Sequence, residues 1–423
     1  MNFSNKKIEY SLAYQQSNLK NNDPKLSSFY GLDKNVKFCK RCLISNQRPS
    51  SSVEFKNKGQ AKSTIEFDKN GICSACNFQD MKDNAIDWID REKQLMDLCN
   101  KFRKTNSRYD CIVPASGGKD SFYTAHLLKS KYGMSPLTVT WAPHIYTDSG
   151  KSNMERMIHA GFDNLLFTPN GALHRTLTRL GFLNLCHPFQ SFIIGQRLIG
   201  PKIAKLYDVK LIFYGENQAE YGNNIKENDS PKMQEKFISN DKNDEIIIGK
   251  LPLEKIIKDN GFHIKSAEPY TPISHEELIN SGIEVHYLSY YKKWDPQENY
   301  YYAVDNSGFM PNDQRTEGTF SRYSSFDDKI DPLHYYTTLI KFGIGRATYD
   351  AAYEIRTKKI DIDEGKLLIK KYEHEFPNRY FNEILEYMKI DEEKFIEVID
   401  SSRSPHLWKY SNGEWDLRYK SYL

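Results

Sequence analysis

The sequence predicts an α/β protein in which a parallel sheet is preceded by a small cysteine-rich module and followed by a mainly helical C-terminal region. Three observations support this fold class. Two CxxC pairs lie near the start of the chain, strand-like and helix-like segments alternate through its middle, and apolar residues recur at helical spacing through most of the remainder. Strands that alternate with helices indicate a parallel sheet, whose ligands bind at the carboxyl ends of the strands.

Composition limits the function only broadly. The 423 residues, enough for more than one domain, include 59 Lys and Arg against 56 Asp and Glu, for a net charge of +3. This balance does not indicate a nucleic-acid-binding protein, so nucleic acid is not expected as a partner. We find neither an apolar run of about 18 residues nor the apolar core of a signal peptide, so no membrane contact and a cytoplasmic location are expected.

The first 80 residues are expected to form a polar arm over 1–37 and a zinc-ribbon module over 38–80. Thirty residues separate the two CxxC pairs, and Gly71 precedes the second pair, where a tight knuckle needs a permissive backbone. Four thiolates form the closed tetrahedral set of a structural Zn²⁺ site, with an iron–sulfur cluster as the alternative. The candidate metal ligands are Cys39, Cys42, Cys73 and Cys76.

Residues 81–222 are predicted to form the α/β domain, beginning with an amphipathic helix over 81–104. Strands are expected at YDCIVPA, SPLTVTWAP, DNLLFTP and DVKLIFYGEN, and helices at SFYTAHLLKSKYG and near 151–160, 171–180 and 189–207. The loops that follow the four strands should therefore lie at one edge of the sheet. These loops are 115–121, 141–144, 168–170 and 215–217.

The second half of the chain divides into two further regions. Residues 223–285 are rich in charge and are expected to form an insertion or lid. Residues 286–423 are expected to be a mostly helical region that binds substrate or a partner. Its successive helices are predicted at TTLIKFG, RATYDAAYEIR, DEGKLLIKKYEHEF and FNEILEYMK.

The segment ASGGKDS, residues 115–121, joins an apolar strand to a helix. Backbone N–H groups of a glycine-rich turn at a helix start bind anions, most often phosphate. Ser116 and Ser121 add hydroxyl donors, Lys119 adds a cation, and Asp120 can cap the helix or bind Mg²⁺. The pattern GxxxxGK[ST] is absent, so a kinase-type or GTPase-type loop is not indicated.

The motif SGGKDS after a strand resembles the SGGxDS signature of the PP-loop ATP pyrophosphatase superfamily. The resemblance implies that the loop binds ATP and that a substrate oxygen attacks its α phosphate, which gives an adenylated substrate and pyrophosphate. Trp141 stands at the position of the superfamily that faces adenine, with a packed core tryptophan as the alternative. The implied ATP-binding residues are Ala115, Ser116, Gly117, Gly118, Lys119, Asp120, Ser121 and Trp141.

Three later stretches, 287–303, 315–356 and 370–380, resemble the N-acetyl sugar amidotransferase family of bacterial surface-glycan pathways, which is associated with lipopolysaccharide O-antigen and pseudaminic-acid-type sugars. This resemblance runs from about Cys39 to Tyr380 and includes both CxxC pairs, SGGKDS and GENQAEYG. It implies that the acetamido group of an N-acetyl sugar, expected to be nucleotide-linked, becomes an acetamidino group. ATP would adenylate the amide oxygen, and ammonia would displace AMP.

The same resemblance implies where the ammonia comes from. The chain contains no GxCxG nucleophile elbow and no N-terminal cysteine that would indicate a glutaminase module. A separate glutamine amidotransferase is therefore expected as a partner. A synthase-like barrel subunit, resembling those of histidine biosynthesis, is expected with it.

Candidate catalytic and substrate-binding residues complete this prediction. Glu216 and Asn217 follow a predicted strand, where a carboxylate can hold Mg²⁺ or orient ammonia and an amide can bind the sugar, unless both are solvated loop residues. The candidate catalytic residues are thus Lys119, Asp120, Glu216 and Asn217. Arginine forks suit the phosphates or carboxylate of an activated sugar, with ordinary salt bridges as the alternative. The candidate substrate-binding residues are Arg315, Glu317, Arg322, Lys341 and Arg346.

Two other functions are compatible with the same motifs. A transfer-RNA sulfurtransferase would share the loop, the zinc pairs and the adenylation, but such enzymes generally carry cysteines beside the ATP loop. Only Cys111 and Cys186 lie in the part of the chain predicted to form the catalytic sheet, and they do not form a CxxC pair. A zinc-stabilised nucleotide-binding scaffold without turnover is the third possibility.

Overall fold

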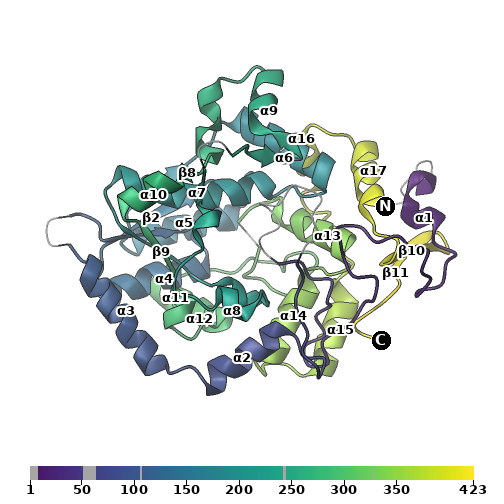
Figure 1. Ribbon diagram of the computed structural model, residues 1–423, viewed down its shortest axis with the longest axis horizontal. Helices are drawn as coiled ribbons and strands as arrows, with labels where there is room; N and C mark the ends of the chain where they lie inside the picture. The colour runs from purple at the N-terminus through teal and green to yellow at the C-terminus, as the bar shows by residue number, and fades with distance from the viewer. Residues whose placement is uncertain (1–7, 51–62, 105–106, 242–243, 326) are drawn as a thin grey trace.

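The computed structural model of the chain describes residues 8–50, 63–104, 107–241, 244–325 and 327–423 (Figure 1). Residues 1–7 of the predicted arm lie outside the described residues, as do residues 51–62 of the predicted zinc module and 242–243 of the predicted insertion.

A five-stranded parallel sheet forms the centre of the α/β region (Figure 1). The strand order is β3-β2-β1-β4-β9. From β1, the next two strands of the chain are added on one side and the later strands on the other side, so the strand order reverses between β1 and β4. Reversal of this kind opens a crevice between the loops that follow the two strands, where ligands of α/β proteins bind. The strands are β1 (Cys111–Pro114), β2 (Pro136–Trp141), β3 (Asn164–Phe167), β4 (Leu211–Tyr214) and β9 (Glu284–Tyr287).

The first four strands coincide with the four strand segments predicted from the sequence, which confirms the α/β class. Strand β9 was not predicted, because EVHY is short, begins with a charged residue and lies at the end of the charge-rich segment interpreted as an insertion. It pairs in parallel with β4, Leu211 lying opposite Glu284.

Helices cover both faces of the sheet. Alternate side chains of a strand point to opposite faces, and Ile112 of β1 shares a buried core with Leu198 of α7, whereas Val113 shares another with Phe122 of α4. Helix α7 packs against β1, β2 and β4, while α12 packs on α4. The helices concerned are α4 (Lys119–Ser130), α5 (Asp148–His159), α6 (Gly171–Leu185), α7 (Gln190–Leu206) and α12 (Pro296–Ser307).

The single helix predicted over 81–104 is divided in two. Helix α2 (Ser74–Asn84) begins earlier, at the second CxxC pair, and α3 (Trp88–Phe102) follows after a break. The carboxylate of Asp87 accepts hydrogen bonds from the N–H groups of Ile89 and Asp90, which starts a new helix where the pattern of apolar residues predicted a continuous one.

The segment between β4 and β9 contains only short elements. Among the described residues they are η3 (Gln218–Tyr221), α8 (Ile225–Asn228), η4 (Glu235–Phe237), β5 (Ser239–Asn240), β6 (Ile247–Ile248), β7 (Leu251–Pro252), α9 (Leu253–Asp259), η5 (Ile264–Tyr270), β8 (Ile273–Ser274) and α10 (His275–Ser281). Helix α11 (Leu288–Tyr291) follows β9. Within the described residues, no helix has the length and apolar character that crossing a membrane requires.

The C-terminal region is mostly helical, as the sequence predicted, and closes with a hairpin. Its elements are α13 (Asp331–Phe342), α14 (Arg346–Arg356), α15 (Ile362–Tyr372), α16 (Phe381–Met388), α17 (Glu392–Ser402), β10 (Trp408–Ser411) and β11 (Glu414–Leu417). Strands β10 and β11 pair in antiparallel fashion across a short turn.

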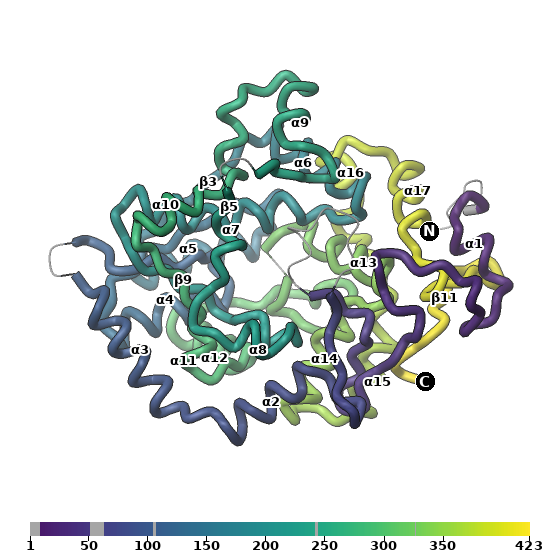
Figure 2. The backbone as a smooth tube through the Cα atoms, viewed as in Figure 1, coloured from purple at the N-terminus to yellow at the C-terminus, as the bar shows by residue number. Residues whose placement is uncertain are grey.

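Residues 8–37, expected from their composition to form an arm, pack against the C-terminal end of the chain (Figure 2). Ser11 donates a hydrogen bond to the Asp400 carbonyl, and Tyr30 donates to the Ser402 carbonyl. Arg418 in turn donates to the carbonyl oxygens of this segment. The N-terminal segment from residue 8 onward and the C-terminal end of the chain therefore lie side by side, with α1 (Leu12–Gln15) next to β10.

Candidate functional site

The SGGKDS loop makes a tight turn from β1 into α4. Gly117 has a φ of +83°, and a Cβ atom there would lie 2.5 Å from the backbone nitrogen of Met154, so only glycine fits. Gly118 is the N-cap residue of α4, and the Ser121 hydroxyl donates to its carbonyl at 3.0 Å. The first backbone N–H groups of α4 consequently face the crevice at the reversal of strand order, where they can bind an anion.

Two charged side chains follow in the first turn of α4. The buried Lys119 ammonium forms an ion pair with Asp120. The other Asp120 oxygen accepts a hydrogen bond of 2.9 Å from the Asn299 side chain of α12. Lys119 also lies 5.7 Å from the centre of the Tyr323 ring. Asp120 is therefore held in place from two sides, which fixes a carboxylate at the anion-binding loop.

The loop after β4 brings a second carboxylate to the crevice. Tyr221 donates a hydrogen bond of 2.5 Å to Glu216, and burial together with the nearby Asp120 charge raises the pKa of Glu216. Asn217 has a different role. Its side-chain oxygen caps η3 by accepting from the Ala219 N–H, and its backbone N–H donates to Ser289. Asn217 thus shapes the turn that presents Glu216.

A cavity of about 530 Å³ lies in front of these loops. Three parts of the chain that are distant in sequence line it. They are the two sheet loops, helices α13 and α14 with the segment before them, and the zinc module; His187 and Pro296 complete the lining. The module contributes Ile44, Arg48, Pro49, Ser50 and Ile65. The cavity brings together many of the residues singled out from the sequence, namely Ser116, Gly118, Lys119, Asp120, Glu216, Lys341 and Arg346.

Four further predicted residues support the loops without lining the cavity: Ala115, Gly117, Ser121 and Asn217. Trp141 lies in the core between β2 and α7. Its ring stacks on Phe167 with centroids 5.2 Å apart, and a Cβ atom at Gly195 would fall 2.2 Å from it. The structure therefore does not bring Trp141 to the cavity.

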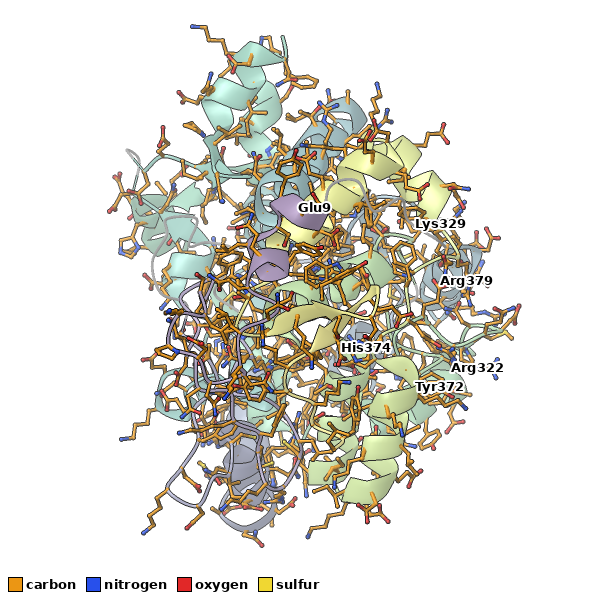
Figure 3. The ribbon with its side chains drawn as sticks, turned by 90° about the vertical axis from the view of Figure 1, so that its right-hand side faces the viewer. Glu9, Arg322, Lys329, Tyr372, His374 and Arg379 are labelled. Atoms are coloured by element: carbon orange, nitrogen blue, oxygen red, sulfur yellow. The ribbon has the colours of Figure 1, made fainter. Side chains whose placement is uncertain are left out.

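The other three predicted substrate-binding residues lie outside the cavity. Arg315 forms a bidentate ion pair with Glu375, one of the two contacts measuring 2.6 Å. Glu317 accepts hydrogen bonds from the backbone N–H groups of residues 378 and 379. Arg322 is exposed and donates to the Asn312 carbonyl, and Figure 3 shows it at the outer surface together with Arg379.

Acidic residues before and within α13 were not selected as site residues from the sequence. Burial and the neighbouring Asp328 charge raise the pKa of Asp327 to about 6, although a hydrogen bond from Ser116 opposes this. Burial and the Asp327 charge raise the pKa of Asp331 to about 7. Both line the cavity. The only feature of the sequence that could have indicated these two residues is their spacing, four positions apart at the start of a helix. Acidic residues are equally typical of ordinary helix starts, where they interact with the helix dipole.

Helix α14 presents Arg346 to the cavity from its first turn. The Arg346 guanidinium pairs with Asp350 at 2.9 Å and lies 4.5 Å from the centre of the Tyr335 ring. The N-terminus of α14 is held by Glu373, which accepts hydrogen bonds from the backbone N–H groups of Gly345 and Thr348 and from the Thr348 hydroxyl. The orientation of Arg346 therefore depends on α15, the helix that precedes Glu373.

The four cysteines of the two CxxC pairs form a buried cluster. Their sulfur atoms all lie within 4.8 Å of one another, with Cys39 and Cys76 3.9 Å apart and Cys42 and Cys73 3.6 Å apart. Four sulfurs bound to one Zn²⁺ at about 2.3 Å are spaced by about 3.8 Å in a tetrahedron. The cluster can therefore hold a zinc ion. Gly71 adopts a φ of +80° at the knuckle, as expected from the sequence.

The metal cluster is fixed to the sheet domain. Ser74, beside Cys73, donates a hydrogen bond of 2.6 Å to the Gly222 carbonyl in the loop after β4. Lys82 of α2 forms a buried ion pair of 2.7 Å with Glu220 of the same loop. The cluster is thus connected by direct contacts to the loop that carries Glu216.

Comparison with known proteins identifies the C-terminal region. Residues 317–421 match the family model described as LPS biosynthesis protein WbpG-like, C-terminal domain. An uncharacterized protein of Methanocaldococcus jannaschii is 31% identical over 88 residues, which are 19% of this chain and 28% of that protein. The chain thus spans little more than a quarter of the length of this relative. The match over 317–421 supports a relation of this segment to WbpG-type lipopolysaccharide biosynthesis proteins.

Proposed function

We propose that the protein is an ATP-dependent amidotransferase of the PP-loop type, which converts the acetamido group of a nucleotide-linked N-acetyl sugar into an acetamidino group. One observation carries this proposal. The SGGKDS loop and helices α13 and α14, which lie within the WbpG-like segment, line the same cavity of about 530 Å³. An anion-binding loop and a glycan-synthesis segment that share one cavity suit an enzyme that activates a sugar with ATP.

The first step requires a site for the pyrophosphate end of ATP. The N–H groups at the start of α4 and the Lys119 ammonium supply positive charge at the loop. Asp120 and Glu216 are the carboxylates that would hold Mg²⁺, whose charge offsets that of the phosphates. The oxygen of the acetamido group attacks the α phosphorus, a new P–O bond forms, and the bond to the bridging oxygen breaks to release pyrophosphate.

The second step replaces the activated oxygen. Ammonia attacks the former amide carbon, the bond from that carbon to oxygen breaks, and the oxygen leaves as part of AMP. Asp331 can accept the proton that ammonia loses, because its pKa of about 7 lies near neutral pH. The amidine product is protonated at neutral pH, so the sugar gains a positive charge.

Zinc and the partners have supporting roles in this proposal. Four thiolates leave no open position on a tetrahedral ion, so Zn²⁺ would stabilise the module and take no part in the reaction. Ammonia would come from a separate glutamine amidotransferase acting with a synthase-like barrel subunit.

A release assay tests the proposal. The protein is incubated with Mg²⁺-ATP, an ammonium salt and a panel of nucleotide-linked N-acetyl sugars, and pyrophosphate, AMP and the mass of the sugar are measured. Release of pyrophosphate and AMP that requires a sugar and gives a product with NH in place of the amide oxygen supports the proposal. Release that requires transfer RNA instead, or no release under any condition, would contradict it.

A further inference from the structure

Arg48 is a buried cation on the cavity wall that the zinc module contributes. It is 7% exposed, and its Nη1 atom has no hydrogen-bond partner among the residues that the structure describes. Within the described ranges, the Arg48 guanidinium makes no ion pair or hydrogen bond, and its neighbours are the rings of Tyr349 at 5.4 Å and Tyr221 at 5.9 Å. Aromatic faces offset only a small part of the cost of burying a charge.

The other cations of the cavity have polar or charged partners. Lys119 pairs with Asp120, Arg346 pairs with Asp350, and Lys341 donates a hydrogen bond of 3.4 Å to the Leu185 carbonyl. Arg356 of α14, also on the cavity wall, lies near the thiol groups of the metal cluster, and the pKa of Arg356 is raised by those cysteines despite burial. A Zn²⁺ ion bound by four thiolates would leave net negative charge close to Arg356.

The surroundings of Arg48 further disfavour its positive charge. The pKa of Arg48 is lowered, chiefly by burial and further by the nearby Arg356 charge. Tyr349, Cys73 and Tyr221 oppose this shift without cancelling it, so the folded protein disfavours the charge at this position. A guanidinium stays protonated in proteins, so the charge remains and needs a negative partner. Because Arg48 lines the cavity, a bound ligand can supply that partner.

We infer that Arg48 binds a phosphate group of the nucleotide that carries the sugar. This inference rests on the proposed function, since it assigns a part of the same substrate. A guanidinium presents parallel N–H donors that match two phosphate oxygens, and a buried, preformed guanidinium loses little freedom on binding. The zinc module would then contribute directly to substrate binding, because Arg48 follows Cys42 by six residues within the same module.

A binding experiment distinguishes this phosphate from those of ATP. Wild-type protein with its zinc is saturated with a non-hydrolysable ATP analogue and Mg²⁺, and UDP-N-acetylglucosamine and UDP are titrated in by calorimetry. Loss of a charge-assisted hydrogen bond to a buried ligand weakens binding by about 10- to 100-fold, which is the expected effect of Arg48→Gln on both probes. The affinity for the ATP analogue should stay unchanged, and Arg48→Lys should lose less than Arg48→Gln.

Arg41→Gln is the matched control. Arg41 belongs to the same module, but its guanidinium bonds to Asp80 at 2.7 and 2.8 Å and does not line the cavity. Its substitution should leave both affinities unchanged. Zinc content and melting temperature show whether each variant is folded, and Arg48→Lys preserves the charge if Arg48→Gln does not fold.

Three results would overturn the inference. They are unchanged binding of the UDP probes by a folded Arg48→Gln protein, weaker binding of the ATP analogue by that variant, and no binding of either probe by the wild type. The proposed reaction is judged separately. If the wild type binds the UDP probes through Arg48 but releases no pyrophosphate with any N-acetyl sugar, the reaction fails while the Arg48 site stands.

Discussion

At the scale of single residues, Asp120 is the side chain on which the proposed chemistry depends most directly. It is held between Lys119 and Asn299 at the start of α4. We expect Asp120→Ala to lower sugar-dependent pyrophosphate release by about 100-fold or more, because charge stabilisation at a preorganised site is lost. Ser116→Ala should also abolish release. Zinc content should be unchanged in both variants.

Asp148→Asn is the control for these two substitutions. Asp148 is an exposed acid in the first turn of the neighbouring helix α5, outside the cavity lining. Its substitution should leave pyrophosphate release within twofold of wild type. Activity that survives both Asp120→Ala and Ser116→Ala would show that the loop is not the ATP site.

The raised pKa of Asp331 predicts how stability depends on pH. Its folded-state pKa is about 7 against an ordinary value of 3.8, so between these values the folded protein holds a proton that the unfolded chain has released. The free energy of unfolding therefore falls as pH rises through this window. Asp331→Asn removes the titrating carboxyl group and with it this fall in the free energy of unfolding. From about pH 5 to about pH 8, the variant should lose about 1–3 kcal/mol less stability than the wild type.

Denaturant unfolding followed by tryptophan fluorescence at several pH values measures this difference. The comparison uses the slope of stability against pH, because any constant effect of the substitution cancels. Parallel pH profiles for the wild type and Asp331→Asn would show that Asp331 does not titrate near neutral pH.

At the scale of elements, helix α14 depends on a cap from a distant residue. Glu373 is buried and satisfies the N–H groups of Gly345 and Thr348. Glu373→Ala leaves these donors without a partner, and we expect the free energy of unfolding to fall by about 1–3 kcal/mol. The exposed Glu386 of α16 offers a control, since Glu386→Ala should change stability by less than about 0.5 kcal/mol. Equal unfolding midpoints for the two variants would refute the capping role.

The metal module is the second element with a clear test. Cys73 is both a member of the sulfur cluster and the N-cap residue of α2. Cys73→Ala should lose bound zinc and lower the melting temperature, because metal binding supplies folding free energy to a module with little core of its own. Cys99→Ala, which removes a buried thiol of α3 outside the cluster, should keep one zinc per chain. Retention of zinc by Cys73→Ala would contradict the assignment.

The sequence predicted elements where local patterns decide the structure. The strands β1 to β4 follow from short apolar runs that alternate with helical patterns, and α14 coincides with the predicted RATYDAAYEIR. Strand β9 was missed because its burial comes from pairing with β4, a contact more than 70 positions away that a short polar-containing segment does not reveal. The break between α2 and α3 was missed because the Asp87 cap competes with a continuous apolar pattern.

At the scale of the whole molecule, the cavity exists because distant parts of the chain meet. Ser74 and Lys82 attach the metal module to the loop after β4, and the C-terminal helices close the other side. Because distant segments form the cavity, only those site residues that belong to a local motif could be predicted from the sequence. SGGKDS carries its own signature. Arg48 has no local motif and becomes a candidate only once the structure shows it buried with no hydrogen-bond partner for Nη1 within the described part of the chain. Arg315 is the opposite case. It was predicted to bind substrate because of the residues around it in the sequence, but in the structure it forms an ion pair with Glu375.

The transfer of one oxygen atom tests the central claim most directly. The N-acetyl sugar that supports pyrophosphate release is prepared with a heavy oxygen isotope in its acetamido group and incubated with Mg²⁺-ATP and ammonium. Adenylation of the amide oxygen predicts that mass spectrometry finds the label in AMP, with one labelled AMP for each acetamidino sugar formed. Unlabelled AMP, with the heavy oxygen retained in the sugar while ATP is consumed, would contradict the account.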